Sequence, residues 1–312
     1  MNYHIAGQTI KLIRKQQGLT QEELASGIME RENLSKFENG KQGIKRETLA
    51  LLINRLGHAA NRFFPFPVSP KEYELLLQQD KLDNAIALNN IDEAEMLLSE
   101  TEALLSDAQI PASFKEGIYL QTLLRCRASL RVLRGEDTQA SRELLNTAIE
   151  ITIPKFKAKL VNTYLLCSDE IEIICMMAEL DYIQGQHGSA ITLLTKLAAS
   201  IRKYYVDPRE KAHNLTFVIY NLSRLLGLQN KHTDALALCN EAIIEGERER
   251  AYYLLPEIKF NKACGLHSLN ENDPEVRDFA YQAYYGCLAL GKVSTASEIK
   301  EQALQLFKIA IH

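Results

Sequence analysis

The sequence of 312 residues contains no tryptophan, only eight prolines and only fifteen glycines. Because proline and glycine are the residues that most strongly interrupt helices, this composition favours a largely helical chain. Its apolar runs are short, and none approaches the roughly 20 residues of a membrane-spanning helix. Lys11, Arg14 and Lys15 come too early for the hydrophobic region of a signal peptide. We therefore expect a cytoplasmic protein that does not bind a membrane.

Cysteine pairs are also missing, since none of the six cysteines forms a Cys-x-x-Cys motif: they are Cys126, Cys167, Cys175, Cys239, Cys264 and Cys287. Each lies within an apolar helical pattern, so we expect buried free thiols, not disulfides or metal ligands. Free thiols are typical of the reducing cytoplasm. The sequence predicts neither a bound metal nor a cofactor.

The chain also lacks the common catalytic motifs. It has no glycine-rich phosphate loop, no His-x-x-x-His and no Gly-x-Ser-x-Gly. His187 and His232 lie near expected turns, where a solvent-exposed position is the simpler interpretation. For Glu170 and Glu172, a solvated or groove-facing surface is favoured over an acid/base pair. We therefore expect a protein that is not an enzyme.

Charge is distributed unevenly along the chain, which carries a net charge of −4. Residues 1–68 contain ten Lys and Arg against six Asp and Glu, whereas the remainder contains 26 against 34. A basic N-terminal part on an acidic remainder suits a domain that binds nucleic acid, with the remainder repelled from the phosphates.

Residues 18–40 contain the most informative pattern in the chain. Thr20 and Glu23 stand three residues apart and predict a capping box at the start of a short helix. The apolar side of this helix and of a second one is formed by Leu24, Ala25, Ile28, Leu34 and Phe37. Asn39-Gly40 predicts the end of the second helix. Two short helices joined by a tight turn indicate a helix-turn-helix, although an αα-hairpin of another helical protein has the same outline.

In a helix-turn-helix the second helix enters the DNA major groove, so its exposed side must be polar. Its first turn offers Arg31, Glu32 and Asn33, which suit guanine, cytosine and adenine respectively. Phosphate contacts are expected from Gln21 at the start of the first motif helix and from Lys36, Lys41, Lys45 and Arg46. Glu38 is interpreted as structural, because an exposed carboxylate at that position would repel DNA.

Further helices complete the N-terminal domain, which we place at residues 1–68. One is expected at 5–17, and another is expected to be capped by Thr48, with an apolar stripe of Leu49, Leu52, Ile53 and Leu56. Pro65, Pro67 and Pro70 predict a linker, because proline does not fit inside a helix. Residues 69–312 then form the second domain.

That second domain has a weak internal repeat of small residues, spaced 46, 50, 45 and 45 apart, at Ala94, Ala140, Ala190, Ala235 and Ala280. A large residue follows each four positions later (Leu98, Leu144, Leu194, Cys239 and Tyr284), and a turn former precedes the first four (Asn89, Gly135, Gly185 and Asn230). The pattern resembles degenerate tetratricopeptide repeats closed by a final helix at 295–309. The predicted fold is all-α, and an irregular helical domain is the alternative.

Amide side chains mark this repeat domain. Asn214 and Asn221 are seven residues apart and thus share a helical face, and Asn261 and Lys262 lie in the middle of the next expected helix. Asparagine is a poor helix former, yet it donates and accepts hydrogen bonds at once, which suits binding to a peptide backbone. Decoration of a solvent-exposed helix is the alternative.

Taken in order, these parts resemble the RRNPP family of bacterial peptide-pheromone receptors, and its PlcR-type regulators most of all. Tyr220-Asn221, fourteen residues before Ala235, matches a Tyr-Asn pair of that group whose Asn binds peptide backbone, and Asn261 matches another amide position. The third repeat departs from the group, because it offers Asp169, Glu172 and Glu179 in place of a clear Asn. That departure favours a basic or amine-bearing ligand.

The resemblance implies a homodimeric transcription factor that binds double-stranded DNA at an inverted-repeat operator. A short linear signalling peptide in the concave groove of the repeats would control that binding. Two other functions stay open: an adaptor that is regulated by a protein partner, and an enzyme-like promoter of partner dephosphorylation, for which no suitable side chain is evident.

Overall fold

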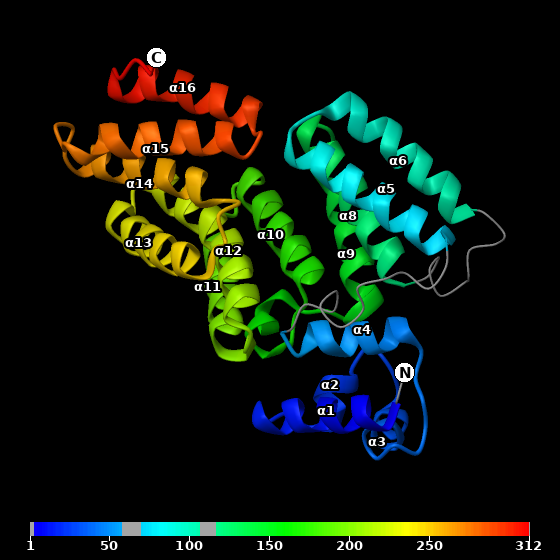
Figure 1. The fold of residues 1–312 in the computed structure, drawn as a ribbon. Helices are drawn as coiled ribbons and strands as arrows, with labels where there is room; N and C mark the ends of the chain where they lie inside the picture. The colour runs from blue at the N-terminus through cyan, green and yellow to red at the C-terminus, as the bar shows by residue number, and fades with distance from the viewer. Residues whose placement is uncertain (1–2, 58–69, 107–116, 312) are drawn as a thin grey trace. The chain divides into compact units, whose positions relative to one another are not determined.

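The computed structural model describes residues 3–57, 70–106 and 117–311, and within these ranges it contains helices and no strand. The first four helices form a small N-terminal domain, which we call the head (Figure 1): α1 (Tyr3–Gln16), α2 (Gln21–Ala25), α3 (Arg31–Glu38) and α4 (Arg46–Arg55). The predicted boundary at 68/69 lies outside the described residues, as do Pro65 and Pro67.

Capping and apolar spacing explain why the head folds as it does. The predicted capping box is confirmed: Thr20 Oγ1 accepts a hydrogen bond from Glu23 N at 3.1 Å, and Glu23 Oε2 accepts one from Thr20 N at 2.7 Å. Leu24, Leu34 and Phe37 are completely buried. The core of the head also contains the predicted stripe of α4, namely Leu49, Leu52, Ile53 and Leu56.

The predicted role of Thr48 is wrong. Helix α4 begins at Arg46, so Thr48 lies inside its first turn, and Lys45 is the N-cap without a side-chain capping bond. Ile44 precedes the cap and Leu49 is the fourth helical residue, and both pack into the core of the head. This hydrophobic staple, not a hydroxyl cap, sets the start of α4.

The rest of the described chain is also helical: α5 (Pro70–Ala87), α6 (Ile91–Ser106), α8 (Ile118–Leu133), α9 (Thr138–Thr152), the 3₁₀ helix η2 (Ala158–Thr163), α10 (Ser168–Ile183), α11 (His187–Tyr204), α12 (Pro208–Leu228), α13 (His232–Glu249), α14 (Leu255–Leu269), α15 (Glu275–Ala289) and α16 (Val293–Phe307). Pro70 was predicted in the linker but is the first residue of α5, a position that proline tolerates. The final helix starts at Val293, two residues before the predicted start.

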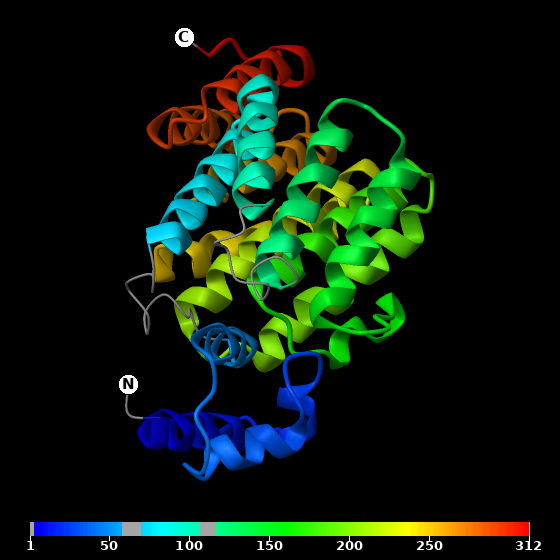
Figure 2. The ribbon, with the colours of Figure 1, turned by 90° about the vertical axis from the view of Figure 1, so that its right-hand side faces the viewer.

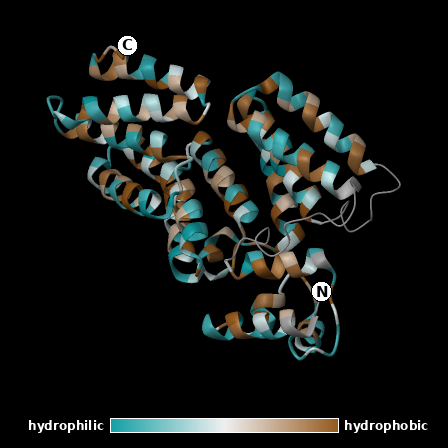
Figure 3. Ribbon diagram, viewed as in Figure 1, coloured by the Kyte–Doolittle hydropathy of each residue, from teal (hydrophilic) through white to brown (hydrophobic). Residues whose placement is uncertain are grey.

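The chain divides into two compact units. The first contains residues 1–176 and 203–210, and within it α5 packs on α6, α8 packs on α9, and α6 contacts α8. The second contains residues 177–202 and 211–312, and within it α13, α14, α15 and α16 pack in succession. Many of the helices show both hydrophobic and hydrophilic bands, as expected when one side of a helix is buried (Figure 3).

The repeat pattern is confirmed at its turns and corrected in its second unit. All four predicted turn formers have left-handed backbone angles: Asn89 (58°), Gly135 (68°), Gly185 (79°) and Asn230 (58°). Ala94, Ala190, Ala235 and Ala280 are buried, but Ala140 is only half-buried, and Ser141 is the completely buried residue at that step. Here Asp137 caps α9, so the turn is one residue longer than predicted. The predicted all-α fold, a helix-turn-helix followed by degenerate tetratricopeptide-type repeats, is confirmed.

Candidate functional site

Helix α3 has one buried and one exposed side. Leu34 and Phe37 are completely buried, whereas Arg31, Glu32 and Lys36 are exposed and Asn33 is half-buried. The first turn of α3 therefore presents a charged and amide-bearing surface on a closed core. That is the arrangement that a helix needs to contact base edges.

A buried network behind α3 fixes the head. Arg14 Nε lies 2.6 Å from Glu38 Oε1 and Arg14 Nη2 lies 2.8 Å from Glu38 Oε2, while Gln21 Nε2 donates to Glu38 Oε2 at 2.7 Å. Burial raises the pKa of Glu38, but the hydrogen bonds from Arg14 and Gln21 outweigh it and leave the pKa below its ordinary value. The structural role of Glu38 is confirmed. Since the side-chain amide of Gln21 already donates to Glu38, a phosphate contact by Gln21 stays a prediction.

The predicted phosphate contacts follow α3. Lys41 and Lys45 are exposed, and the side chain of Arg46 lies outside the described part of the structure. Lys11 Nζ donates to Asn39 Oδ1 at 2.7 Å, which fastens the end of α3 to α1. These positions extend the basic surface beyond α3 along the connection to α4.

In the first unit, two predicted ligand-binding acids lie near a buried arginine. Arg125 is 7% exposed, and its guanidinium lies 2.7 Å from Asp83 Oδ1 and 2.8 Å from Glu172 Oε2. Burial raises the pKa of Glu172 to about 7, although Arg125 acts in the opposite direction, and burial also raises the pKa of Asp169. Sequence reasoning missed Arg125. The signal for it was a charged residue in the apolar pattern Leu124-Arg125-Cys126, which requires an opposite charge nearby.

Glu170 was predicted on a solvated or groove-facing surface, and this is wrong. The residue is completely buried, pairs with Arg55 at 2.9 Å and accepts a hydrogen bond from Cys167 N at 2.8 Å. It therefore caps the first turn of α10 and compensates a charge from the head. Arg55 was not identified from the sequence.

In the second unit, the predicted amides have different surroundings. Asn214 is 2% exposed. Asn221 is half-buried, and its Nδ2 donates to Phe217 O of its own helix at 2.9 Å. Asn261 Nδ2 donates to Tyr220 O at 3.1 Å and to Ser223 Oγ at 3.0 Å, which joins α14 to α12.

Lys262, the two histidines and the cysteines complete the set of residues singled out from the sequence. Lys262 Nζ lies 4.1 Å from the centre of the Phe279 ring. His187 and His232 are half-buried, so the prediction of solvent-exposed histidines is wrong. The ring of His187 meets Tyr182 edge-on with centroids 4.3 Å apart, because both residues flank the same repeat turn. The six cysteines are free thiols, and all are buried except Cys264, which is half-buried.

Within the ranges that the structure describes, no group of histidine, cysteine and acidic residues is arranged to hold a metal ion. No described helix combines the length and the apolar character required to cross a membrane.

Comparisons with known proteins agree with this geometry. The helix-turn-helix family model matches residues 10–57. The fold resembles Bacillus thuringiensis PlcR in complex with the peptide PapR7 and DNA, with 16% identity, a TM-score of 0.61 and coverage of 95% of this chain and 99% of that chain. It also resembles ComR from S. thermophilus in complex with DNA and its signalling peptide ComS, with 17% identity, a TM-score of 0.55 and coverage of 96% and 99%. A third similar structure is ComR from Streptococcus vestibularis with its cognate signalling peptide XIP, with 12% identity, a TM-score of 0.52 and coverage of 97% and 98%. No curated protein sequence matches the chain.

Residues 10–57 thus match a helix-turn-helix domain, and the helices that follow them are of the tetratricopeptide-repeat type. In fold, the chain is of the PlcR and ComR type, and the resemblance to RRNPP regulators is confirmed at that level.

Proposed function

We propose that the chain is a cytoplasmic transcriptional regulator whose binding to an operator is controlled by a short linear signalling peptide. The observation that carries the proposal is the exposed first turn of α3, with Arg31 and Glu32 on a completely buried core of Leu34 and Phe37. In this proposal Arg31, Glu32 and Asn33 contact base edges. Phosphates are bound by Gln21, Lys36, Lys41, Lys45 and Arg46.

The regulator would bind as a homodimer. One recognition helix contacts too few base pairs for specificity among the many sites of a genome, so two heads are required. Two-fold symmetry of the protein then demands an inverted repeat, with half-sites separated by about one helical turn or a multiple of it.

Peptide control is supported by amide and acidic side chains in the repeats. Asn221 is half-buried, and its Oδ1 accepts no hydrogen bond from the described residues, so it is available to a peptide N–H. We assign Asn214, Asn261 and Lys262 to the same peptide-binding function. Asp83, Asp169 and Glu172 interact with the single guanidinium of Arg125, and a basic or amine-bearing peptide would favour the ionised forms of Asp169 and Glu172, whose pKa values are raised, which supports a ligand of that kind.

Selection of duplexes from a random-sequence library by the full-length chain tests the DNA-binding part. The expected product is an inverted repeat. Arg31→Ala should weaken binding by about 1–3 kcal/mol at its cognate base and relax specificity there. Lys45→Ala should weaken all sequences alike and reduce the salt dependence. Failure to enrich any sequence would contradict the proposal and favour an adaptor that is regulated by a protein partner.

A further inference from the structure

The segment that follows α9 is strongly basic. Residues 154–163, which we call the basic loop, read Pro-Lys-Phe-Lys-Ala-Lys-Leu-Val-Asn-Thr and contain three lysines and no acidic residue. Lys155, Lys157 and Lys159 are all exposed. This concentration of positive charge is unusual here, because residues 69–312 carry 34 acidic against 26 basic residues. The proposed peptide site uses none of these lysines.

The backbone of the basic loop is held in place. Lys157 N donates to Tyr164 Oη at 3.2 Å, and the rings of Phe156 and Tyr164 lie 5.5 Å apart. Lys155 has a left-handed φ of 59°, and residues 158–163 of the basic loop form the 3₁₀ helix η2. The lysines therefore extend from a structured turn, so ordering them on a ligand costs little backbone entropy.

The basic loop also lies against the head. Leu165, which follows the loop, is 6% exposed and packs in the core of the head with Leu24 and Leu56. At its other end, a Cβ added to Gly27 would lie 1.9 Å from Thr152 O and 2.9 Å from Pro154 Cδ. Gly27 belongs to the turn between α2 and α3, and Figure 2 shows this turn rising towards the chain after α9. The loop is thereby fixed beside the start of the recognition helix.

We propose that the basic loop binds backbone phosphates of the duplex beyond the base pairs contacted by α3. The proposal rests on the proposed DNA-binding function. When α3 enters a major groove, phosphates of the DNA backbone flank its first turn. A lysine can bind such a phosphate wherever its ammonium group comes within reach of it, whatever the base sequence. Lysine suits this role because its ammonium binds phosphate as a point charge without demanding one geometry. Lys155 and Lys157 carry the proposal, and Lys159 lies on the same loop.

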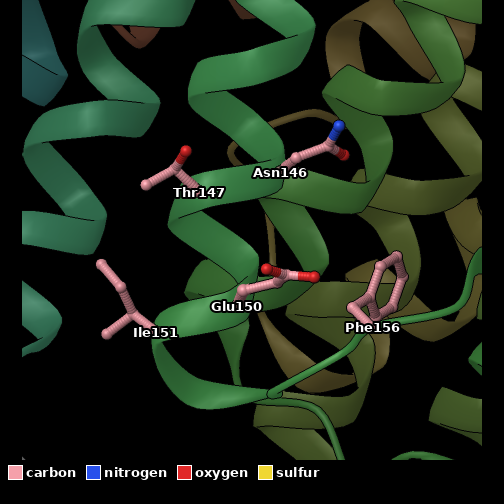
Figure 4. A pocket seen from close by; sticks show the side chains of 5 residues that line it. All are labelled: Asn146, Thr147, Glu150, Ile151 and Phe156. Carbon is pink, nitrogen blue, oxygen red and sulfur yellow. The ribbon is translucent and has the colours of Figure 1, made fainter.

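One acidic side chain opposes this attraction. Glu150 on α9 lines a shallow hollow with Phe156, and its carboxylate points towards the loop (Figure 4). A phosphate at the basic loop would be repelled by this carboxylate. Removing the charge of Glu150 should therefore strengthen DNA binding, whereas removing the charges of the lysines should weaken it.

The test uses the full-length chain and two duplexes that carry the sequence selected by that chain. The short duplex ends at the outer edges of the half-sites, and the long duplex extends each end by about one helical turn, roughly 10 base pairs. Affinity is measured by fluorescence anisotropy over a series of salt concentrations. Lys155→Ala/Lys157→Ala is compared with Lys81→Ala/Lys231→Ala, a control that removes two exposed lysines elsewhere.

On the long duplex, the loop variant should reduce the slope of log affinity against log salt by about 1.8, which corresponds to two phosphates. On the short duplex it should behave as wild type, and the control variant should match wild type on both. Glu150→Gln should bind the long duplex more tightly. An unchanged slope, or an equal loss on both duplexes, or an equal loss in the control overturns the inference while the DNA-binding function stands. If the wild-type chain selects no duplex, both fail together.

Discussion

Arg55 and Glu170 form a buried ion pair, with Arg55 Nη2 2.9 Å from Glu170 Oε1 and side chains that are 5% and 1% exposed. Arg55 is the last residue of α4 and Glu170 lies in the first turn of α10, so the pair joins the head to the repeats within the first compact unit. Arg55 also donates to the backbone oxygens of Ser26 and Thr152. One guanidinium thus holds the helix-turn-helix turn and the ends of two repeat helices.

Breaking this pair from one side should be costly. Glu170→Ala leaves the buried guanidinium of Arg55 uncompensated, and we expect a loss of about 3–5 kcal/mol in unfolding free energy. The double variant Arg55→Met/Glu170→Leu should lose much less, because no charge remains buried. Urea denaturation checks both.

The control for that comparison is Glu241→Ala. Glu241 pairs with Arg202 at 2.8 Å, but the two side chains are 36% and 37% exposed, so its loss should cost about 0–1 kcal/mol. If Glu170→Ala is no more destabilising than Glu241→Ala, the Arg55–Glu170 pair does not hold the head.

Two glycines with the same backbone angle should respond differently to substitution. Gly18 and Gly27 both have φ of +71°, but a Cβ at Gly18 meets open space, whereas a Cβ at Gly27 would overlap Thr152 O. Gly18→Ala should cost only the strain of a left-handed residue, about 1–2 kcal/mol. Gly27→Ala must also push the head away from residues 152–154. Hydrogen exchange in the segment around Leu165 should rise in Gly27→Ala alone, and equal exchange in both variants would refute this contact.

Glu172 should titrate near neutral pH. Its pKa is raised to about 7 by burial. Because the folded pKa exceeds the unfolded one, its contribution to stability is fully present below about pH 4.3 and is lost as the pH rises through about 7. A carbon-13 carboxyl resonance with a midpoint near 7 should therefore be present in wild type and missing in Glu172→Gln. Between pH 5 and 8, wild type should lose stability relative to Glu172→Gln, whereas Glu301→Gln, an exposed control on α16, should follow wild type. Parallel stability curves for wild type and Glu172→Gln would contradict this assignment.

Replacing Asn221 and replacing Asn261 with alanine should change the stability of the protein by different amounts. Asn261→Ala removes hydrogen bonds between α14 and α12, to Tyr220 O and Ser223 Oγ, and should destabilise the protein by about 1–3 kcal/mol. Asn221→Ala removes only a bond within α12 and replaces a poor helix former, so it should be neutral or slightly stabilising. Thermal denaturation of both variants measures this, and a larger loss for Asn221→Ala would reverse the assignment.

The head was predictable because its determinants are local. The capping box of Thr20 and Glu23 and the burial of Leu34 and Phe37 follow from spacings of a few residues. The start of α4 was missed for a related reason. Thr48 is an acceptable cap by type, but the packing of Ile44 and Leu49 in the core decides the start, and residue type alone does not show packing.

Long-range partners explain the other errors. Glu170 looks like a surface acid in sequence, and its burial depends on Arg55, 115 residues away. A repeat pattern predicts which residue is buried only to within one position. In the second repeat the buried residue is therefore Ser141 and not Ala140. The ion pairs of Arg125 and the position of the basic loop beside the head could not be predicted either, because both depend on helices that are distant in sequence.

Reciprocal linkage between peptide and DNA tests the central claim most directly. A peptide that binds the full-length chain is first selected from a display library of peptides of 7 to 10 residues. Its affinity is then measured by calorimetry with and without the selected operator duplex, in wild type and Asn221→Ala. The account predicts that peptide and duplex change each other's affinity by the same factor. It also predicts that Asn221→Ala weakens peptide binding about ten- to a hundredfold and leaves peptide-free DNA binding unchanged. Affinities that are independent of each other, or wild-type peptide affinity in Asn221→Ala, would contradict it.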